Sequence, residues 1–193
     1  MFKIIAVTNR TLCTGDYFKQ IEQIAKSGVS SVIVREKGLS EWEYAVLAKK
    51  VQEICWENSV ECILHTQIGA AKELKNPAIH LPFSILQRNW EVLHDFQKIG
   101  TSVHSEEEAI AAEKLGVHYV VAGHIFQTDC KKGLPPRGVD FLAGVVQSVQ
   151  IPVYAIGGIG ENNVQAIKGT GAAGACIMSR FMRFKSPAFS IEV

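Results

Sequence analysis

Glycines in the last quarter of the chain could seat a phosphate group. The segment Gly157-Gly158-Ile159-Gly160 follows a short apolar run, and a backbone without Cβ atoms can approach an anion closely. A helix expected to begin near Glu161 would point its free N–H groups at the same anion. Met178 and Ser179, which end the next apolar run, would donate from the opposite side. This pattern predicts a phosphate site, and a tight turn without a ligand is the alternative.

Arg35 and Lys37 stand at the end of another apolar run, with one residue between them. Alternation along a strand would point both side chains toward the same side. Two neighbouring cations suit an anionic substrate. The alternative is a pair of solvated charges balanced by Glu36.

His124 belongs to an eleven-residue polar segment, 123–133, which also holds Asp129, Cys130 and two lysines. The segment is long enough to act as a lid over a site. An imidazole ordinarily titrates near neutrality, so His124 can accept and donate protons at physiological pH. A structural histidine is the alternative. For Cys130 as a nucleophile, the sequence offers no base that can be assigned.

Other reactive side chains are less favourably placed. His65 and His80 lie at or near the ends of two further apolar runs and are candidates to line a pocket. No cluster of Asp, Glu and His has the spacing of a metal site, so we expect neither a metal ion nor a cofactor. The five cysteines are odd in number and lack Cys-x-x-Cys spacing, which favours reduced thiols.

Eight short apolar runs, alternating with amphipathic stretches, must position these residues. Most runs are rich in Val and Ile without strict polar–apolar alternation, which is typical of parallel strands covered by helices. The predicted strands are 3–8, 31–35, 61–65, 78–81, 98–103, 119–122, 152–156 and 173–178. The predicted helices are 16–27, one from each of the capping boxes at Ser40 and Ser105, and 67–75, 86–96, 138–148 and 160–168.

Alternation of strands and helices implies parallel strands joined by right-handed crossovers. Eight such units predict an α/β fold, a compact (β/α)8 TIM barrel with residues 1–193 as a single domain. Few residues follow the last predicted strand, and they include Pro187, so the eighth helix should be short or missing. An open doubly wound sheet is the alternative. In a barrel, the residues singled out above would gather at the C-terminal ends of the strands.

Charge and hydropathy exclude several classes of protein. Lys and Arg number 20 against 19 Asp and Glu, a net charge of +1, so net charge does not favour binding to nucleic acid or an anionic membrane. No apolar run reaches the roughly 18 residues that a membrane-spanning helix needs. The N-terminal apolar stretch is too short for a signal peptide. We therefore expect a cytoplasmic protein without nucleic-acid or membrane partners.

Three motifs resemble the thiamine phosphate synthase superfamily, and the likeness extends over nearly the whole chain. They are Val34-Arg35-Glu36-Lys37, Gly100-Thr101-Ser102-Val103-His104-Ser105 and Ala155-Ile156-Gly157-Gly158-Ile159. Two branches share these motifs. Thiamine phosphate synthase joins a pyrimidine pyrophosphate to a thiazole phosphate with Mg²⁺. The other branch, the thiazole tautomerase TenI, aromatises a carboxythiazole phosphate tautomer.

Two features of the sequence favour the TenI branch. The synthase holds Mg²⁺ with Asp carboxylates at places that here read His65-Thr66-Gln67 and Leu81-Pro82-Phe83-Ser84, and a hard cation without an oxygen anion is poorly held. A synthase Gln that binds the pyrimidine is replaced by Ile33. The segment 123–134, with its Gly-His start and Thr-Asp-Cys-Lys-Lys-Gly-Leu end, closely resembles TenI. The segment at His65 and Thr66 departs from TenI, which has Asn-Gly there.

The resemblance implies a role for each matching residue. His124 matches the TenI histidine proposed to move the proton. The other implied positions are Gly157, Gly158 and Ser179 for phosphate, Arg35, Lys37 and Ser102 in the pocket, and Lys131 as a loop lysine near the substrate.

We therefore expect a thiazole tautomerase of thiamin biosynthesis, a metal-free isomerase that binds a thiazole phosphate. Its phosphate would bind at Gly157, Gly158, Met178 and Ser179, and its carboxylate would face Arg35 or Lys37. His124 would transfer the proton. The alternatives are a Mg-dependent thiamine phosphate synthase and a non-catalytic regulator that binds a phosphorylated ligand. The sequence leaves a homodimer open.

Overall fold

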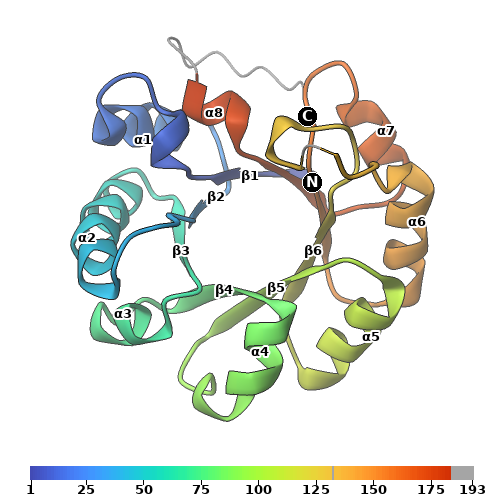
Figure 1. Ribbon diagram of the computed structural model, residues 1–193, viewed down its shortest axis with the longest axis horizontal. Coiled ribbons are helices and arrows are strands. Elements are labelled where there is room, and N and C mark those ends of the chain that lie inside the picture. Colours follow the sequence, from blue (N-terminus) through green and yellow to red (C-terminus); the bar gives the residue numbers. More distant parts are fainter. Residues whose placement is uncertain (132, 184–193) are drawn as a thin grey trace.

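Eight parallel strands close into a barrel in the computed structural model, which describes residues 1–131 and 133–183 (Figure 1). Each strand pairs with its neighbours in the sequence, and the first strand pairs with the last. The strands are β1 (Lys3–Val7), β2 (Ser31–Val34), β3 (Glu61–His65), β4 (Ala78–Pro82), β5 (Lys98–Val103), β6 (Tyr119–Gly123), β7 (Val153–Ile156) and β8 (Gly174–Ile177). The predicted (β/α)8 barrel is confirmed, and the open sheet is excluded.

Helices surround the barrel on its outer side (Figure 1). They are α1 (Tyr17–Lys26), α2 (Glu41–Glu57), α3 (Ile68–Glu73), α4 (Phe83–Asn89), α5 (Glu106–Leu115), α6 (Gly138–Ser148), α7 (Val164–Gly169) and α8 (Ser179–Arg183). Short 3-10 turns lie at Arg10–Leu12, Trp90–Val92 and Asp129–Lys131. The last helix is short, as expected, although Pro187 lies outside the described residues.

Two separate apolar layers explain why the strands read as nearly continuous apolar runs. One layer packs the outer face of the barrel against the helices, with Ile21, Leu64 and Leu142 among its fully buried members. The other fills the barrel interior and includes Ile63 and Val121. A strand buried on both faces has apolar residues at successive positions rather than at every second one.

The two predicted capping boxes turn out differently. At the start of α2, Ser40 accepts a hydrogen bond from the backbone N–H of Glu43, and the Glu43 carboxylate accepts from the backbone of Ser40. At the start of α5, Ser105 accepts from the N–H of Glu108 at 3.1 Å. The Glu108 carboxylate instead accepts from the N–H of His104 at 2.7 Å, so the second box is only half formed.

One glycine inside the barrel makes room for a tyrosine ring on the next strand. Gly100 of β5 pairs with Tyr119 of β6, and the Tyr119 side chain points into the barrel interior. A Cβ atom at position 100 would lie 2.0 Å from Cζ of Tyr119, far inside a normal contact. The absence of a side chain at Gly100 therefore lets the Tyr119 ring fill the barrel.

We expect Gly100→Ala to lower the free energy of unfolding by about 1–3 kcal/mol, because the Tyr119 ring would have to move. Urea denaturation monitored by circular dichroism measures the change. Gly169→Ala is the matched control, because no atom lies within 4 Å of the added Cβ at the end of α7. Equal stability of the two variants would contradict the steric role of Gly100.

Candidate ligand site at the barrel mouth

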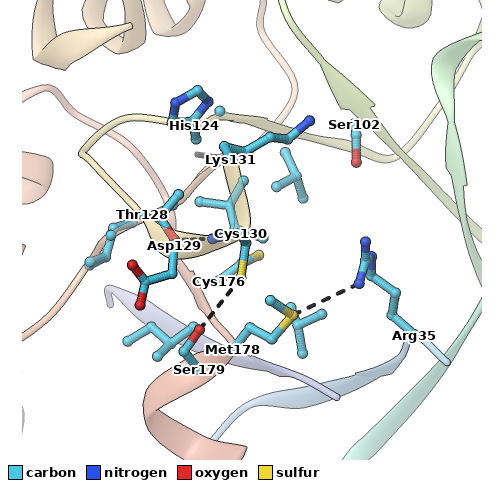
Figure 2. Close-up of a pocket in the computed structure, with 18 of the residues that line it drawn as sticks. Arg35, Ser102, His124, Thr128, Asp129, Cys130, Lys131, Cys176, Met178 and Ser179 are labelled. Atoms are coloured by element: carbon cyan, nitrogen blue, oxygen red, sulfur yellow. Dashed lines mark hydrogen bonds between the residues drawn. The ribbon is translucent and has the colours of Figure 1, made fainter. Parts of the chain in front are cut away.

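A cavity of about 600 Å³ opens where the C-terminal ends of the strands converge. Figure 2 shows side chains from β2, β5, the loop after β6 and the end of β8 around it. All nine residues that the sequence analysis predicted for the site line this cavity: Arg35, Lys37, Ser102, His124, Lys131, Gly157, Gly158, Met178 and Ser179. The structure therefore brings them together, while their individual roles stay predictions.

The charge of the cavity wall is strongly positive. In the part of the chain that the structure describes, the lining cations are Arg35, Lys37, Lys131, Arg180 and Arg183, against the single carboxylate of Asp129. Arg180 pairs with Glu161, and Arg183 lies 3.9 Å from Asp129. Neither Arg35, Lys37 nor Lys131 forms an ion pair with another described residue. Cations without carboxylate partners, gathered in a concave wall, attract an anionic ligand.

Glu36 does not neutralise its two cationic neighbours. Its buried carboxylate accepts from Thr8 Oγ1 at 2.6 Å, Arg10 N at 2.8 Å and Tyr17 OH at 2.9 Å. Burial, and then the negative charge of Glu36, raises the pKa of Tyr17 far above its ordinary value, so the phenol stays a donor. The carboxylate thus ties the end of β2 to β1 and leaves Arg35 and Lys37 facing the cavity.

The glycine turn after β7 is shaped by packing as well as by access to a ligand. Gly157 and Gly158 have φ values of +104° and +67°, which favour glycine. A Cβ on Gly157 would lie 2.4 Å from Cβ of His124, and one on Gly158 would lie 2.4 Å from the carbonyl oxygen of Gln127. The turn therefore packs directly beneath the loop after β6.

The helix expected near Glu161 begins later than predicted. Helix α7 starts at Val164, and the N–H of Gly160 donates to Asn163 Oδ1 at 2.8 Å. The predicted start of this helix is wrong, because the chain makes an extra turn closed by Asn163 before the helix begins. Ser179, by contrast, opens α8 directly at the cavity wall.

His124 forms part of the cavity wall but is largely buried. The residue is only 9% exposed, and its Nε2 atom has no hydrogen-bond partner among the described residues. In Figure 2 the ring lies across the cavity from Ser179 and is turned away from Ser102 and Arg35. Because Nε2 is buried, this ring nitrogen is closed to a ligand in the cavity unless the ring moves.

The two histidines of β3 and β4 occupy different places. His65 lines the cavity, and its Nδ1 lies 2.6 Å from Thr66 Oγ1. His80 lies behind Ser102, with its Nε2 2.9 Å from Ser102 Oγ. Burial lowers the pKa of His80 to about 3 and holds that of His65 well below its ordinary value, with a smaller contribution from His80. Both rings are therefore neutral near pH 7, and the positive charge of the wall comes from Arg and Lys.

Sequence reasoning missed several residues of the wall. Arg180 and Arg183 stand three apart on α8 and both line the cavity, a spacing that places side chains on one helix face. The thiol of Cys130 is exposed and lies 3.7 Å from Ser179 Oγ, which links the loop after β6 to α8. The two arginines spaced three apart after the last strand could have indicated this part of the cavity wall from the sequence.

The residues after β3 and β4 do not fit a divalent cation. Thr66 and Gln67 follow β3, and Phe83 and Ser84 follow β4, so neither place offers a carboxylate. Among the described residues, no group of three His, Cys, Asp or Glu side chains could hold a metal ion. Magnesium prefers oxygen anions as ligands, and Asp129 is paired with Arg183.

Residues 4–181 match a protein-family model described as thiamine monophosphate synthase. The chain belongs to this family. It is 35% identical over 193 residues to a thiamine-phosphate synthase of Fusobacterium nucleatum, covering 98% of this chain and 94% of that protein. It is 32% identical over 188 residues to a thiamine-phosphate synthase of Syntrophomonas wolfei, covering 94% and 88%. A solved thiamine phosphate pyrophosphorylase from Pyrococcus furiosus superposes with a TM-score of 0.83 at 26% identity, covering 96% and 90%.

The comparisons correct the expected reaction class. The superfamily resemblance is confirmed, but these relatives are named thiamine-phosphate synthase, a transferase, and not thiazole tautomerase. The expectation of an isomerase is therefore wrong. It rested on one loop, 123–134, and on missing carboxylates, whereas the similarity to the synthases extends along the whole chain.

None of the helices in the described part of the chain is both long enough and apolar enough to span a membrane.

We expect the protein to lose stability as the pH falls from 7.5 to 5. In the unfolded chain His80 takes up a proton near pH 6.5, whereas in the folded protein its pKa is about 3, so acid favours unfolding between these values. At pH 5 this costs about 2 kcal/mol. Urea denaturation at both pH values measures the loss, which should be smaller in His80→Gln. His94→Gln, which changes an exposed histidine, should retain the full loss.

We expect Arg35→Gln to weaken binding of inorganic pyrophosphate by about tenfold or more, because a charge-assisted hydrogen bond is removed. Isothermal titration calorimetry measures the change. Arg88→Gln on α4 is the matched control, since its guanidinium donates to the nearby carbonyl of Ser84 at the surface and does not line the cavity. Unchanged affinity in Arg35→Gln would show that the anion binds elsewhere.

Proposed function

We propose that this protein is a thiamine-phosphate synthase, which joins a thiazole phosphate to a pyrimidine pyrophosphate and releases pyrophosphate. The observation that carries this proposal is the cavity of about 600 Å³ at the barrel mouth, whose described wall holds five cations and one carboxylate. Both substrates are anions, and the pyrophosphate group gains negative charge when it is released. The names of relatives that cover nearly the whole chain support the same reaction.

The cavity offers separate places for the two phosphate-bearing groups. The thiazole phosphate would lie against Gly157, Gly158 and Ser179, where backbone and hydroxyl donors meet. The pyrophosphate would face Arg35 and Lys37 on the opposite part of the wall. Met178 lies between these places, and its sulfur is 3.9 Å from Arg35 Nη1. With both bound, the thiazole nitrogen would face the pyrimidine carbon that carries the leaving group.

The chemical step needs stabilisation of the leaving group more than proton transfer. A C–N bond forms to the thiazole nitrogen while the C–O bond to pyrophosphate breaks, and the bonding pair leaves with the pyrophosphate oxygen. Fixed cations placed where this charge develops lower the barrier. Arg35, Lys37 and Lys131 are the described residues of the wall best suited to this task, because they form no ion pairs with other described residues. Ser102 would add a hydrogen bond.

His124 is proposed as a ligand contact. The proton-transfer role that was expected of it belonged to the isomerase reaction. His124 lines the cavity, where it would pack against the thiazole end of the ligand, while its buried Nε2 has no hydrogen-bond partner among the described residues. The homodimer that the sequence leaves open and the expected cytoplasmic location are not tested by the structure.

A second candidate function is ligand binding without coupling. It is favoured by the side chains after β3 and β4, which provide no carboxylate for the Mg²⁺ that the family resemblance implies. Ile33, whose side chain is buried in the barrel interior, also replaces the glutamine expected to bind the pyrimidine. Such a protein would act as a sensor of a phosphorylated thiazole.

The two candidates are distinguished by incubating the protein with both substrates and Mg²⁺, and in parallel with EDTA. We expect thiamine phosphate and pyrophosphate to form in equal amounts, measured by chromatography, and Arg35→Gln to lower the rate at least tenfold. Arg88→Gln should match the unmodified protein. No product, together with a raised melting temperature in thiazole phosphate, would contradict the synthase and support the sensor.

A further inference from the structure

Three polar side chains form a hydrogen-bonded row from the barrel interior to the cavity. The hydroxyl of Tyr119 on β6 lies 3.1 Å from Nδ1 of His80 on β4. Nε2 of the same imidazole lies 2.9 Å from Oγ of Ser102 on β5. Ser102 lines the cavity, whereas the other two are only 2% exposed. The row thus joins two buried groups to one that can touch a ligand.

The partners available to each group decide the direction of these bonds. Burial raises the pKa of Tyr119 well above its ordinary value, so its hydroxyl keeps its proton. Within the described residues His80 Nδ1 is the hydrogen-bond partner of that hydroxyl. A buried O–H without an acceptor costs about 1–3 kcal/mol, so the Tyr119 hydroxyl donates to Nδ1.

The tautomer of His80 follows from that donation. A neutral imidazole carries one N–H, and if Nδ1 accepts, the hydrogen is on Nε2. Burial keeps the ring neutral, with a pKa of about 3, so this tautomer persists near neutral pH. The Nε2–H therefore donates to Ser102 Oγ. The Ser102 hydrogen has no acceptor among the described residues and is left to point into the cavity.

We propose that His80, held by Tyr119, is a positioning residue that makes the Ser102 hydroxyl a hydrogen-bond donor toward an anionic ligand. A serine hydroxyl offers one hydrogen and two lone pairs, and this row occupies one lone pair while leaving the hydrogen for a ligand. A ligand oxygen carrying negative charge can accept this hydrogen, and the bond is then charge-assisted. The inference rests on the proposed function only in taking an anion as the ligand.

The neighbouring His65 does not take part in this row. Its ring stacks on His80 at 5.6 Å between centroids, and its Nδ1 is bonded to Thr66. The stack and the interior packing hold the His80 ring in place without competing for either of its nitrogens. The two partners of His80 are therefore enough to specify its tautomer.

The tautomer can be read directly in the ligand-free protein. We expect ¹⁵N NMR of histidine-labelled protein to show His80, assigned by the loss of its signals in His80→Gln, with hydrogen on Nε2 and none on Nδ1. Tyr119→Phe should shift these signals, and Tyr154→Phe should not, because Tyr154 packs against the Tyr119 ring at 5.6 Å between centroids and is not a hydrogen-bond partner in the row. Hydrogen on Nδ1, or a charged ring at pH 7, would overturn the proposal.

The functional consequence is tested by binding of inorganic pyrophosphate, measured by calorimetry. We expect Ser102→Ala to weaken binding by about tenfold or more and Tyr119→Phe by about threefold to tenfold. In the Ser102→Ala background, Tyr119→Phe should have no further effect, because it acts only through the hydroxyl. Tyr154→Phe should bind like the unmodified protein.

Two results of this cycle would contradict the inference. Equal losses from Tyr119→Phe in both backgrounds would show a purely structural effect, and full affinity in Ser102→Ala would show that the hydroxyl does not contact the anion. Neither measurement uses the coupling reaction. A protein that fails to make thiamine phosphate but shows the expected tautomer and cycle would therefore overturn only the proposed function.

Discussion

The pairing of β1 with β8 is the constraint on which the rest of the structure depends. Lys3 to Ala6 lie in register with Gly174 to Ile177, so the first and last strands close the barrel. Closure removes both edges of the sheet and brings all eight C-terminal strand ends to one mouth. It also places Arg35 beside Met178, 143 residues apart in the chain. Without that pairing, Arg35 and Ser179 would belong to distant parts of the molecule.

The mouth combines fixed positive charge with neutral polar groups. Arg and Lys supply the charge, and because burial keeps His65 and His80 neutral near pH 7, they add none. Glu36 could have cancelled part of the charge, but its three hydrogen bonds direct it toward β1 and α1. The result is a chain of nearly zero net charge with a strongly positive cavity. Net charge alone therefore said little about the ligand.

The family and the metal ligands point in different directions. The relatives are named as synthases, yet the places after β3 and β4 carry Thr66, Gln67, Phe83 and Ser84. The proposed function reconciles them if side-chain cations, rather than a metal ion, neutralise the leaving pyrophosphate. The loop 123–134 led the sequence analysis toward the tautomerase, but a single loop changes more easily than the framework that positions it.

The sequence by itself determined the fold and picked out nine of the residues that line the cavity. Each predicted strand agrees with the observed one to within a residue at either end, because strands buried on both faces have an apolar pattern that needs no tertiary information. Strand ends then gather the nine predicted residues in one cavity. Only the tertiary structure decided how those residues are used. It turned Glu36 away from Arg35, bonded Ser102 to His80, and started α7 three residues beyond Glu161. These outcomes depend on contacts with residues from other strands and on the space available between them. Neither can be inferred from a local pattern of residues.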